Sequence, residues 1–337
     1  MLKLLKSLTT PTPGTYACQL VSTTVKPTSN GGQQLVIEVD DGGGAIKLSF
    51  FEKHPWFPTG STIPKGECLS ITGTFQADQW GVQCPDLKSG YLNEHETAKL
   101  FAGPEKLAAK QLHDWQVIRE LIEVMPKENS YRALLLLFIK DHEASFRRAA
   151  AARGNHHARR GGLVEHVSFM MRNVASICNH YTELYPQMDR NLALCATFLH
   201  DVGKLWENNY PVTGFVQEYD LAAEAIGHIV IGIQVAATYW NRLPEPMRSE
   251  VHKLRALQHC IASHHGTKEW GSPVEPACPE AIVLHFVDNI DAKMNMMVDC
   301  IATSERPAPF LVKKVFPMER NVILFDTMPQ VSSESAQ

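Results

Sequence analysis

Hydrophobic and polar positions alternate in short segments between residues 14 and 92. β-branched and aromatic residues fill these segments, and turn-forming stretches such as HPWFPTGSTIPKG separate them. An alternation with a period of two predicts β-strands that are buried on one face. The predicted strands are TYACQLVSTTV, QQLVIEVDD, AIKLSFFEK, ECLSITGTF and WGVQCPDL. Five short strands favour a small barrel of the OB type, although the pattern also fits another five-stranded β module.

From Glu94 onward, apolar residues recur at intervals of three and four positions, which predicts amphipathic helices. Pro126 ends the first long segment. No strand pattern interrupts the series up to about residue 305, so this region is expected to be all-α. The main helical segments are LAAKQLHDWQVIRELIEVM, SYRALLLLFIKDHEASFRRAAAA, GLVEHVSFMMRNVASICNHYTELY, NLALCATFLHDVGKLWE, DLAAEAIGHIVIGIQVAATYW, EVHKLRALQHCIASHH and PEAIVLHFVDNIDAKMNMMVDCIAT.

These two patterns predict a multidomain α+β chain, with a five-stranded OB-like β-barrel followed by an all-α domain. A length of 337 residues suits two domains. The last residues of the C-terminal tail are expected to be disordered. We expect an N-terminal tail at 1–13, the OB-like domain at 14–92, a linker at 93–110, the all-α domain at 111–305 and a C-terminal tail at 306–337.

Composition and charge narrow the class of protein. The net charge of -4 gives no global attraction for a polyanion, so nucleic-acid binding would need a local patch. No stretch approaches the roughly 20 apolar residues of a membrane span, and the apolar run at the start is too short for a signal peptide. Eight cysteines are scattered without a CxxC pair. We therefore expect reduced thiols, a cytoplasmic location and no membrane partner.

The strongest chemical signal is the pair His200-Asp201 in the segment ALCATFLHDVGKLWE. The predicted helix places this pair next to an apolar stripe, and adjacent side chains about 100° apart can flank one ion. Buried polar groups of this kind need a partner or a metal. Lys204 lies three residues beyond Asp201, so it shares the same face and could hold a phosphate oxygen.

Further histidines and aspartates occur on the other predicted helices, in the order H, HD, H, HH, D. A single histidine such as His228 on an apolar helix is more often a structural residue than a ligand, but the ordered set favours a metal site. Asp291 shares a helix face with Asp288 and is an alternative last ligand. The predicted metal ligands are His166, His200, Asp201, His228, His264, His265 and Asp288.

Imidazole nitrogens together with carboxylate oxygens suit divalent Mn, Fe, Co, Ni or Zn. The histidines beyond the basic set allow a second ion, with Asp201 as the bridge. Two ions about 3.5–4 Å apart could activate a water and clamp both oxygens of a phosphoryl displacement. The residues alone leave open whether one or two ions bind.

The helical region resembles the HD superfamily of metal-dependent phosphohydrolases. More closely, the chain from about residue 14 to 305 resembles the YhaM family of 3′→5′ exoribonucleases, in which an OB-fold precedes an HD domain. The phrases that carry this resemblance are NHHARRGGLVEHV, LYPQMDRNLALCATFLHDVGK, ASHHGTKEWGSPVEP and LHFVDNIDAKMN. The resemblance implies a first ion at His166, His200, Asp201 and Asp288, a second ion near His228, His264 and His265, and manganese as the metal.

Candidate substrate contacts come from two places. The β region offers aromatic side chains for base stacking, with Trp56 and Phe57 as the chosen positions, although each could equally be core. Residues 1–100 contain eight Lys, no Arg and nine acidic residues, so their net charge is 8 − 9 = −1, which departs from a strongly basic groove. A local basic patch lies between 140 and 160, and His157 and Arg160 at its end are the predicted phosphate contacts.

These features together predict a metal-dependent 3′→5′ exonuclease that hydrolyses single-stranded RNA, with DNA as a further substrate, by metal-activated water. Asp201 would position the metal and accept a proton, while Lys204 and Arg160 would stabilise charge on the phosphate. The rivals are a nucleotide or cyclic-dinucleotide phosphohydrolase, a non-catalytic nucleic-acid-binding adaptor and a conjugation-related nicking protein. The sequence leaves open whether the chain forms homo-oligomers.

Overall fold

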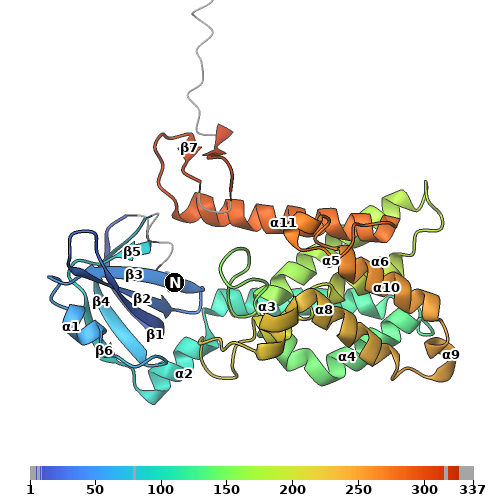
Figure 1. The fold of residues 1–337 in the computed structure, drawn as a ribbon, viewed down its shortest axis with the longest axis horizontal. Coiled ribbons are helices and arrows are strands. Elements are labelled where there is room, and N and C mark those ends of the chain that lie inside the picture. The colour runs from blue at the N-terminus through green and yellow to red at the C-terminus, as the bar shows by residue number, and fades with distance from the viewer. Residues whose placement is uncertain (1–4, 6–7, 9, 79–80, 315–317, 326–337) are drawn as a thin grey trace, which may run out of the picture. The chain divides into compact units, whose positions relative to one another are not determined.

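The computed structural model describes Leu5, Leu8 and residues 10–78, 81–314 and 318–325. The chain divides into two compact units (Figure 1). One unit comprises Met1–Leu100 with Met294–Gln337, and the other is Phe101–Lys293. The first unit is rich in strands and the second is helical, so the expected mixed α+β class is confirmed.

Six strands form the sheet of the first unit. Their pairing runs from β1 through β2, β3 and β5 to β4, and β4 pairs again with β1, while β6 adds to β4. β1 makes both contacts because its first half, from Thr12 to Gln19, pairs with β4, and its second half pairs with β2. The strands are β1 Thr12–Pro27, β2 Gln33–Asp40, β3 Ala45–Phe51, β4 Cys68–Asp78, β5 Gly81–Gln83 and β6 Lys88–Tyr91.

One side of this sheet builds an apolar core from alternate positions, such as Leu35 and Ile37 of β2. The short helix α1, Phe57–Gly60, packs beside it. Leu5 and Leu8, within the segment expected to be a tail, are buried in the same core. Leu5 and Leu8 therefore contribute apolar contacts to the sheet.

Most helices lie in the second unit, and several begin at residues that the sequence suits to that position. Asn129 and Asp189 each accept two backbone N–H bonds at the start of a helix, and Asp220 accepts one. The helices are α2 Glu94–Ala102, α3 Glu105–Glu123, α4 Ser130–Phe146, α5 Gly162–Tyr181, α6 Arg190–Leu199, α7 Lys204–Glu207, α8 Leu221–Trp240, α9 Glu245–Arg248, α10 Val251–Ser263, a 3₁₀ turn Lys268–Trp270 and α11 Pro279–Thr303.

Two helices differ from their predicted form. The segment 191–207 was expected to be one helix, but α6 ends at Leu199 and α7 starts at Lys204. α8 is kinked at Gly227, whose φ of 73° and ψ of 161° are not helical. Residues 93–110, the expected linker, contain α2 and the first turns of α3.

The C-terminal segment expected to be a tail contains a small ordered element in its described part. β7, Leu311–Val312, pairs with β8, Val322–Ile323, and their valines pack on Cys300 of α11. The apolar patch NVILF thus supplies β8. The final residues, for which disorder was expected, lie outside the described residues.

Among the described residues, α8 is the one helix that is long and apolar enough to cross a membrane. This is weak support for a span, because the core helix of a globular protein has the same length and composition. α8 packs against α7 and α10 within the helical unit.

Candidate metal centre

Four predicted ligands from three parts of the helical unit meet in one buried cluster. His166 on α5 places its Nε2 3.3 Å from Nε2 of His200 and 3.4 Å from Oδ1 of Asp288. The Oδ2 of Asp201 lies 3.3 Å from His200 Nε2 and 3.7 Å from His166 Nε2. The ligand atoms of His166, His200 and Asp201 lie within 4.8 Å of one another, close enough to hold one ion together.

The other oxygen of Asp201 faces a second group of histidines. Its Oδ1 lies 3.5 Å from Nε2 of His228 and 3.7 Å from Nε2 of His264. His228, His264 and His265 each offer a nitrogen within 4.8 Å of the others. Asp201 therefore stands between two sets of nitrogens, with one oxygen toward each.

A tight turn of the backbone orients the Asp201 side chain between the two sets of nitrogens. After α6, the N–H of Val202 bonds to the carbonyl of Leu199, and the N–H of Lys204 bonds to the carbonyl of Asp201. These are 3₁₀-type bonds, so the backbone is more tightly wound than the predicted α-helix. Gly203 lets this turn approach α8, since a Cβ there would lie 2.2 Å from the carbonyl oxygen of His228.

Each histidine of the cluster is held by a hydrogen bond on its other ring nitrogen. Nδ1–H of His200 donates to the carbonyl of Thr197, and Nδ1–H of His264 donates to that of Ile261. His265 donates in the same way to the carbonyl of Trp270 at 2.7 Å. These bonds leave each Nε2 as a lone-pair donor that can bind a metal.

Two histidines use carboxylates for the same purpose. Nδ1 of His166 lies 2.7 Å from Asp291, and Nδ1 of His228 lies 3.0 Å from Glu207. Asp291 therefore contacts the far side of the His166 ring, while Asp288 contacts the Nε2 side. Of the two alternative last ligands, Asp288 is the one that faces the cluster.

Three buried polar atoms of the cluster indicate that it binds an ion. Asp201 Oδ1, His228 Nε2 and His264 Nε2 are buried and have no hydrogen-bond partner. Buried polar atoms are seldom left in this state because it costs about 1–3 kcal/mol each. A divalent cation would satisfy all three atoms, and imidazole with carboxylate is a donor set that such ions prefer.

Electrostatics keep Asp201 ionised and His264 neutral. Burial alone would raise the pKa of Asp201, but the Lys204 ammonium 2.6 Å away and the His200 ring hold that pKa well below its usual value. Burial lowers the pKa of His264 well below its usual range. An ionised aspartate and a neutral imidazole are the protonation states that coordinate metal.

Comparison with known proteins adds a family to this geometry. Residues 163–293 match the model of the HD domain family. This part of the chain is an HD domain. The chain is also 37% identical over 202 residues to the 3′-5′ exoribonuclease YhaM of Bacillus subtilis, a match that covers 60% of each chain. The alignment thus spans about three fifths of that relative's length.

The HD domain contains all seven predicted metal ligands, from His166 to Asp288. Two predicted phosphate contacts, His157 and Arg160, lie just before its first residue. His157 is buried and its Nε2 lies 3.0 Å from Asp291, the same carboxylate that holds His166. Its backbone has a φ of 46°, and among the described residues it is the one non-glycine with a positive φ. The structure thus places His157 behind the HD cluster.

Arg160 is occupied by backbone carbonyls. Its guanidinium donates to Pro211 at 2.7 Å, to Val212 at 2.8 Å and to Gly214 at 3.1 Å. These bonds hold the loop between α7 and α8 against the start of α5. A phosphate would have to displace them to reach the same N–H groups.

The two aromatic residues chosen for base stacking lie in the β core of the first unit. Trp56 is 5% exposed and donates its indole N–H to Ser89, and Phe57 is 9% exposed. Neither ring presents a face to solvent. Phe51, at the end of β3, is 64% exposed instead.

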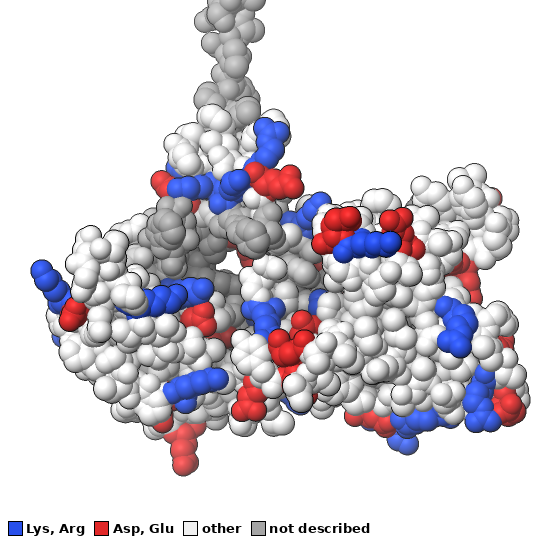
Figure 2. Space-filling model, in the orientation of Figure 1, with Lys and Arg blue, Asp and Glu red and all other residues white. Residues whose placement is uncertain are grey.

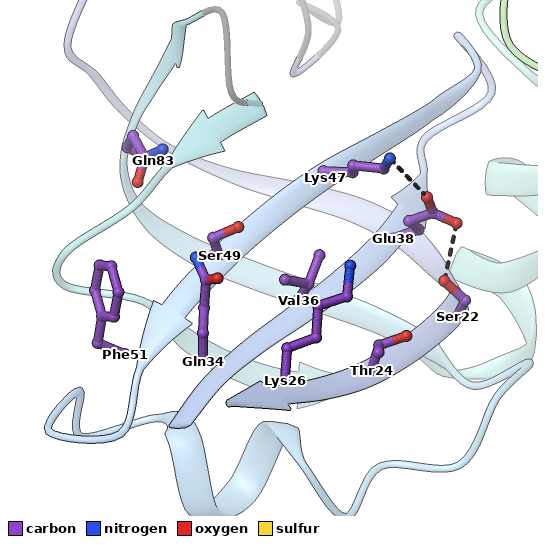
Figure 3. A pocket seen from close by; sticks show the side chains of 10 residues that line it. All are labelled: Ser22, Thr24, Lys26, Gln34, Val36, Glu38, Lys47, Ser49, Phe51 and Gln83. Atoms are coloured by element: carbon purple, nitrogen blue, oxygen red, sulfur yellow. Dashed lines mark hydrogen bonds and ion pairs between the residues drawn. The ribbon is translucent and has the colours of Figure 1, made fainter. Parts of the chain in front are cut away.

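Phe51 borders a pocket of about 470 Å³ on the outer face of β1, β2 and β3 (Figure 3). The cross-strand register aligns Phe51 with Gln34 and Lys26, and it aligns Lys47 with Glu38 and Ser22. Glu38 accepts a hydrogen bond from Ser22 at 2.8 Å and pairs with Lys47 at 3.6 Å. Lys26 has no ion pair among the described side chains, so one uncompensated positive charge lines the same pocket as the exposed Phe51 ring.

On the face of the molecule shown in Figure 2, lysine and arginine side chains are interspersed with acidic ones. No patch of a single sign dominates that face. This agrees with the net charge of -4 and leaves local groups to attract a polyanion.

Sequence reasoning missed two features of the site. Glu207, which orients His228, lies within the predicted helix but was not linked to any histidine. Glu165 is buried beside His166 and binds Arg159 and Lys110. The glutamate next to a ligand histidine in the phrase VEHV could have drawn attention to such support, whereas the pairing of Glu207 with His228 needs the fold.

Proposed function

We propose that this chain is a metal-dependent phosphodiesterase that removes nucleotides from the 3′ end of single-stranded RNA. The observation that carries the proposal is Asp201, whose two oxygens face two sets of histidine nitrogens inside an HD domain. The direction of attack and the choice of RNA come from the printed name of the Bacillus subtilis relative.

Each predicted ligand has a role in this proposal. His166, His200 and Asp288 would hold one divalent ion with Asp201 Oδ2, and His228, His264 and His265 would hold a second ion with Asp201 Oδ1. We expect Mn²⁺, while Fe, Co, Ni and Zn suit the same donors. Bound ions supply a water that ionises near neutral pH and positive charge for the phosphate.

Side chains around the proposed ions would complete the catalytic site. Lys204 holds Asp201 ionised and adds a positive charge at the phosphate position. In this proposal, Asp201 would position the ions and receive the proton of the attacking water. Asp291 and Glu207 fix the ring planes of His166 and His228, so that these metal ligands are positioned before the substrate arrives.

The β unit would supply the strand contact. Its pairing through β1, β2, β3, β5 and β4 and back to β1 supports an OB-like barrel. The pocket on its outer face offers an exposed ring at Phe51 for stacking and Lys26 for a phosphate. Base stacking tolerates any sequence, as degradation of RNA from an end requires.

We also propose a cytoplasmic location. All eight cysteines are free, and two structural disulfides or more would be usual in a secreted domain of comparable cysteine content. The protein would then meet its RNA substrate in the cytoplasm.

The proposal is tested with a 5′-labelled single-stranded RNA. A ladder that shortens from the 3′ end with wild-type protein and Mn²⁺, and that disappears with EDTA, is the expected result. Asp201→Ala should abolish it, while His180→Ala, an exposed histidine on the same helix as His166, should leave it intact. Hydrolysis of mononucleotides without RNA shortening would favour the nucleotide phosphohydrolase, and strand binding that survives Asp201→Ala without any hydrolysis would favour the adaptor.

A further inference from the structure

Two cysteines that are not metal ligands lie close together in the helical unit. Sγ of Cys260 on α10 is 4.0 Å from Sγ of Cys278, eighteen residues later and immediately before α11. They belong to the eight free cysteines of the chain. A disulfide has an S–S distance of about 2.05 Å, so the sulfurs need to approach by roughly 2 Å to bond.

The two thiols have opposite surroundings. Cys278 precedes Pro279, the first residue of α11, and its carbonyl accepts the N–H of Ile282 at 3.0 Å, so it occupies the N-cap position. The Cys260 thiol and the backbone N–H of Ala281 both stabilise the Cys278 thiolate and lower its pKa, although partial burial opposes them. The positive end of the helix dipole acts in the same direction.

Cys260 is a different kind of thiol. It is fully buried in the helical core, where its bond to Cys278 and its burial raise its pKa well above the usual value. A hydrogen bond joins the two sulfurs at 4.0 Å. Cys278, which is partly exposed at the start of α11, is set up as the nucleophile, and the buried Cys260 is the partner that resolves the oxidised product.

Reagents can reach Cys278 from solvent. It lines an open apolar groove of about 800 Å³ together with Pro279, Ile282 and Tyr181. Cys278 itself is partly exposed. A small neutral oxidant can enter such a groove, whereas a charged reagent is disfavoured by its apolar walls.

We propose that Cys278 and Cys260 form a modification site for hydroperoxides, which oxidise the pair to a disulfide. The Cys278 thiolate attacks the terminal peroxide oxygen, an S–O bond forms as the O–O bond breaks, and an alcohol or water leaves after protonation. The Cys260 sulfur then attacks the sulfenic acid, the S–S bond forms, and the released hydroxide combines with the Cys260 proton as water. Two thiols lose two electrons, and the peroxide gains them.

The disulfide would change the conformation of the segment between the two cysteines. Residues 261–277 lie between the two cysteines, and they carry His264 and His265. Moving the ends of this segment by about 2 Å changes the position of both rings against Asp201. If the proposed function holds, oxidation lowers the phosphodiesterase activity, and a thiol reductant restores it.

The covalent change is tested on the whole protein with hydrogen peroxide as the probe. Peptide mass spectrometry without reduction should find the Cys260 and Cys278 peptides linked, with a mass 2 Da below their sum, and dithiothreitol should separate them. Cys260→Ala should instead leave a sulfenic acid on Cys278 that a dimedone probe labels. In Cys278→Ser, Cys260 should stay reduced at the same peroxide dose.

Cys18 and Cys68 of the β unit provide the matched control. Cys68 is also partly exposed, but burial raises the pKa of both thiols. They should remain reduced while the pair reacts. The proposal is overturned if peroxide leaves Cys260 and Cys278 unlinked, or if Cys68 is oxidised as fast as Cys278 in protein whose thermal unfolding is unchanged.

Activity is measured separately, so that the two proposals fail independently. Linked peptides together with an RNA ladder that slows several-fold and recovers on reduction are the expected result. Linked peptides with an unchanged ladder would reject the effect on the metal cluster. Absence of any ladder in reduced protein would reject the proposed nuclease and leave the thiol chemistry as measured.

Discussion

Asp291 shows how a residue that faces away from the cluster can control it. Its carboxylate binds Nδ1 of His166 at 2.7 Å and Nε2 of His157 at 3.0 Å. Together these bonds fix the plane and the tautomer of His166. Loss of such a partner usually weakens metal binding or activity by 10- to 100-fold.

We therefore predict that Asp291→Asn lowers Mn²⁺ affinity and RNA hydrolysis by about 10- to 100-fold, and that excess metal partly restores the rate. Isothermal titration with Mn²⁺ measures the first effect directly. Glu183→Gln, at an exposed carboxylate just after α5, is the control and should behave as wild type. An equal loss in both variants would show a general effect of removing a carboxylate charge instead.

Gly203 is the second residue whose role is set by contact. A Cβ at this position would lie 2.2 Å from the carbonyl of His228, and backbone cannot move aside as a flexible side chain can. We predict that Gly203→Ala destabilises the fold by about 1–3 kcal/mol and separates the turn of Asp201 from α8. The temperature of thermal unfolding and the rate of RNA hydrolysis should both fall.

Gly154→Ala is the control, because a Cβ there meets nothing within 4 Å. It should change the stability by less than about 0.5 kcal/mol. If Gly203→Ala were as stable and active as Gly154→Ala, the close approach of the turn to α8 would not be needed for the site.

Much of the candidate site could be predicted from residue types and their order. Five histidines and two aspartates on the predicted helices signal polar groups that need a common partner. Which carboxylate faces the cluster could not be predicted, because Asp288 and Asp291 are three residues apart and share a helix face. The distances to the two nitrogens of His166 separate them.

At the scale of elements, the same apolar pattern fits more than one backbone. Phe198, Leu199, Val202 and Leu205 are all buried, although α6 ends at Leu199 and a tight turn follows. The periodicity therefore predicted one helix and could not locate the break. β6, with the sequence KSGY, has no apolar alternation, and for that reason it was not predicted.

Arg160 joins the start of α5 to the loop before α8. Its three acceptors are carbonyls of that loop at 2.7 to 3.1 Å, which a planar fork of donors can bind together. We predict that Arg160→Ala destabilises the loop by about 1–3 kcal/mol and that Arg160→Lys does not restore it. Chymotrypsin should then cut the loop after Phe215 or Tyr219 faster than in wild type.

Arg147→Ala serves as the control, since Arg147 pairs with Glu143 one turn away on an exposed surface. Its proteolysis should be unchanged. A stable, protease-resistant Arg160→Ala protein with a higher KM for RNA would instead favour the direct phosphate contact that the sequence suggested.

At the scale of the whole chain, the proposal assigns strand contact to one unit and hydrolysis to the other. The sequence predicted aromatic residues in the β unit but could not say which are core. Neighbouring residues on a strand face opposite sides, and Phe50 is 2% exposed while Phe51 is 64% exposed. Trp56 and Phe57 are core because they follow the strand and close over its apolar face.

Because the proposal assigns strand contact to the β unit, we predict that Phe51→Ala weakens RNA binding. Stacking of one base on an aromatic ring contributes about 1–3 kcal/mol, so the affinity for a single-stranded RNA should fall about 5- to 150-fold. Hydrolysis of a small chromogenic phosphodiester, which has no base to stack on Phe51, should stay the same. The control is Tyr91→Ala, because Tyr91 on β6 is 67% exposed yet lies outside the pocket of Figure 3. If Tyr91→Ala weakens RNA binding as much as Phe51→Ala, or if neither does, then the outer face of β1, β2 and β3 does not bind the strand.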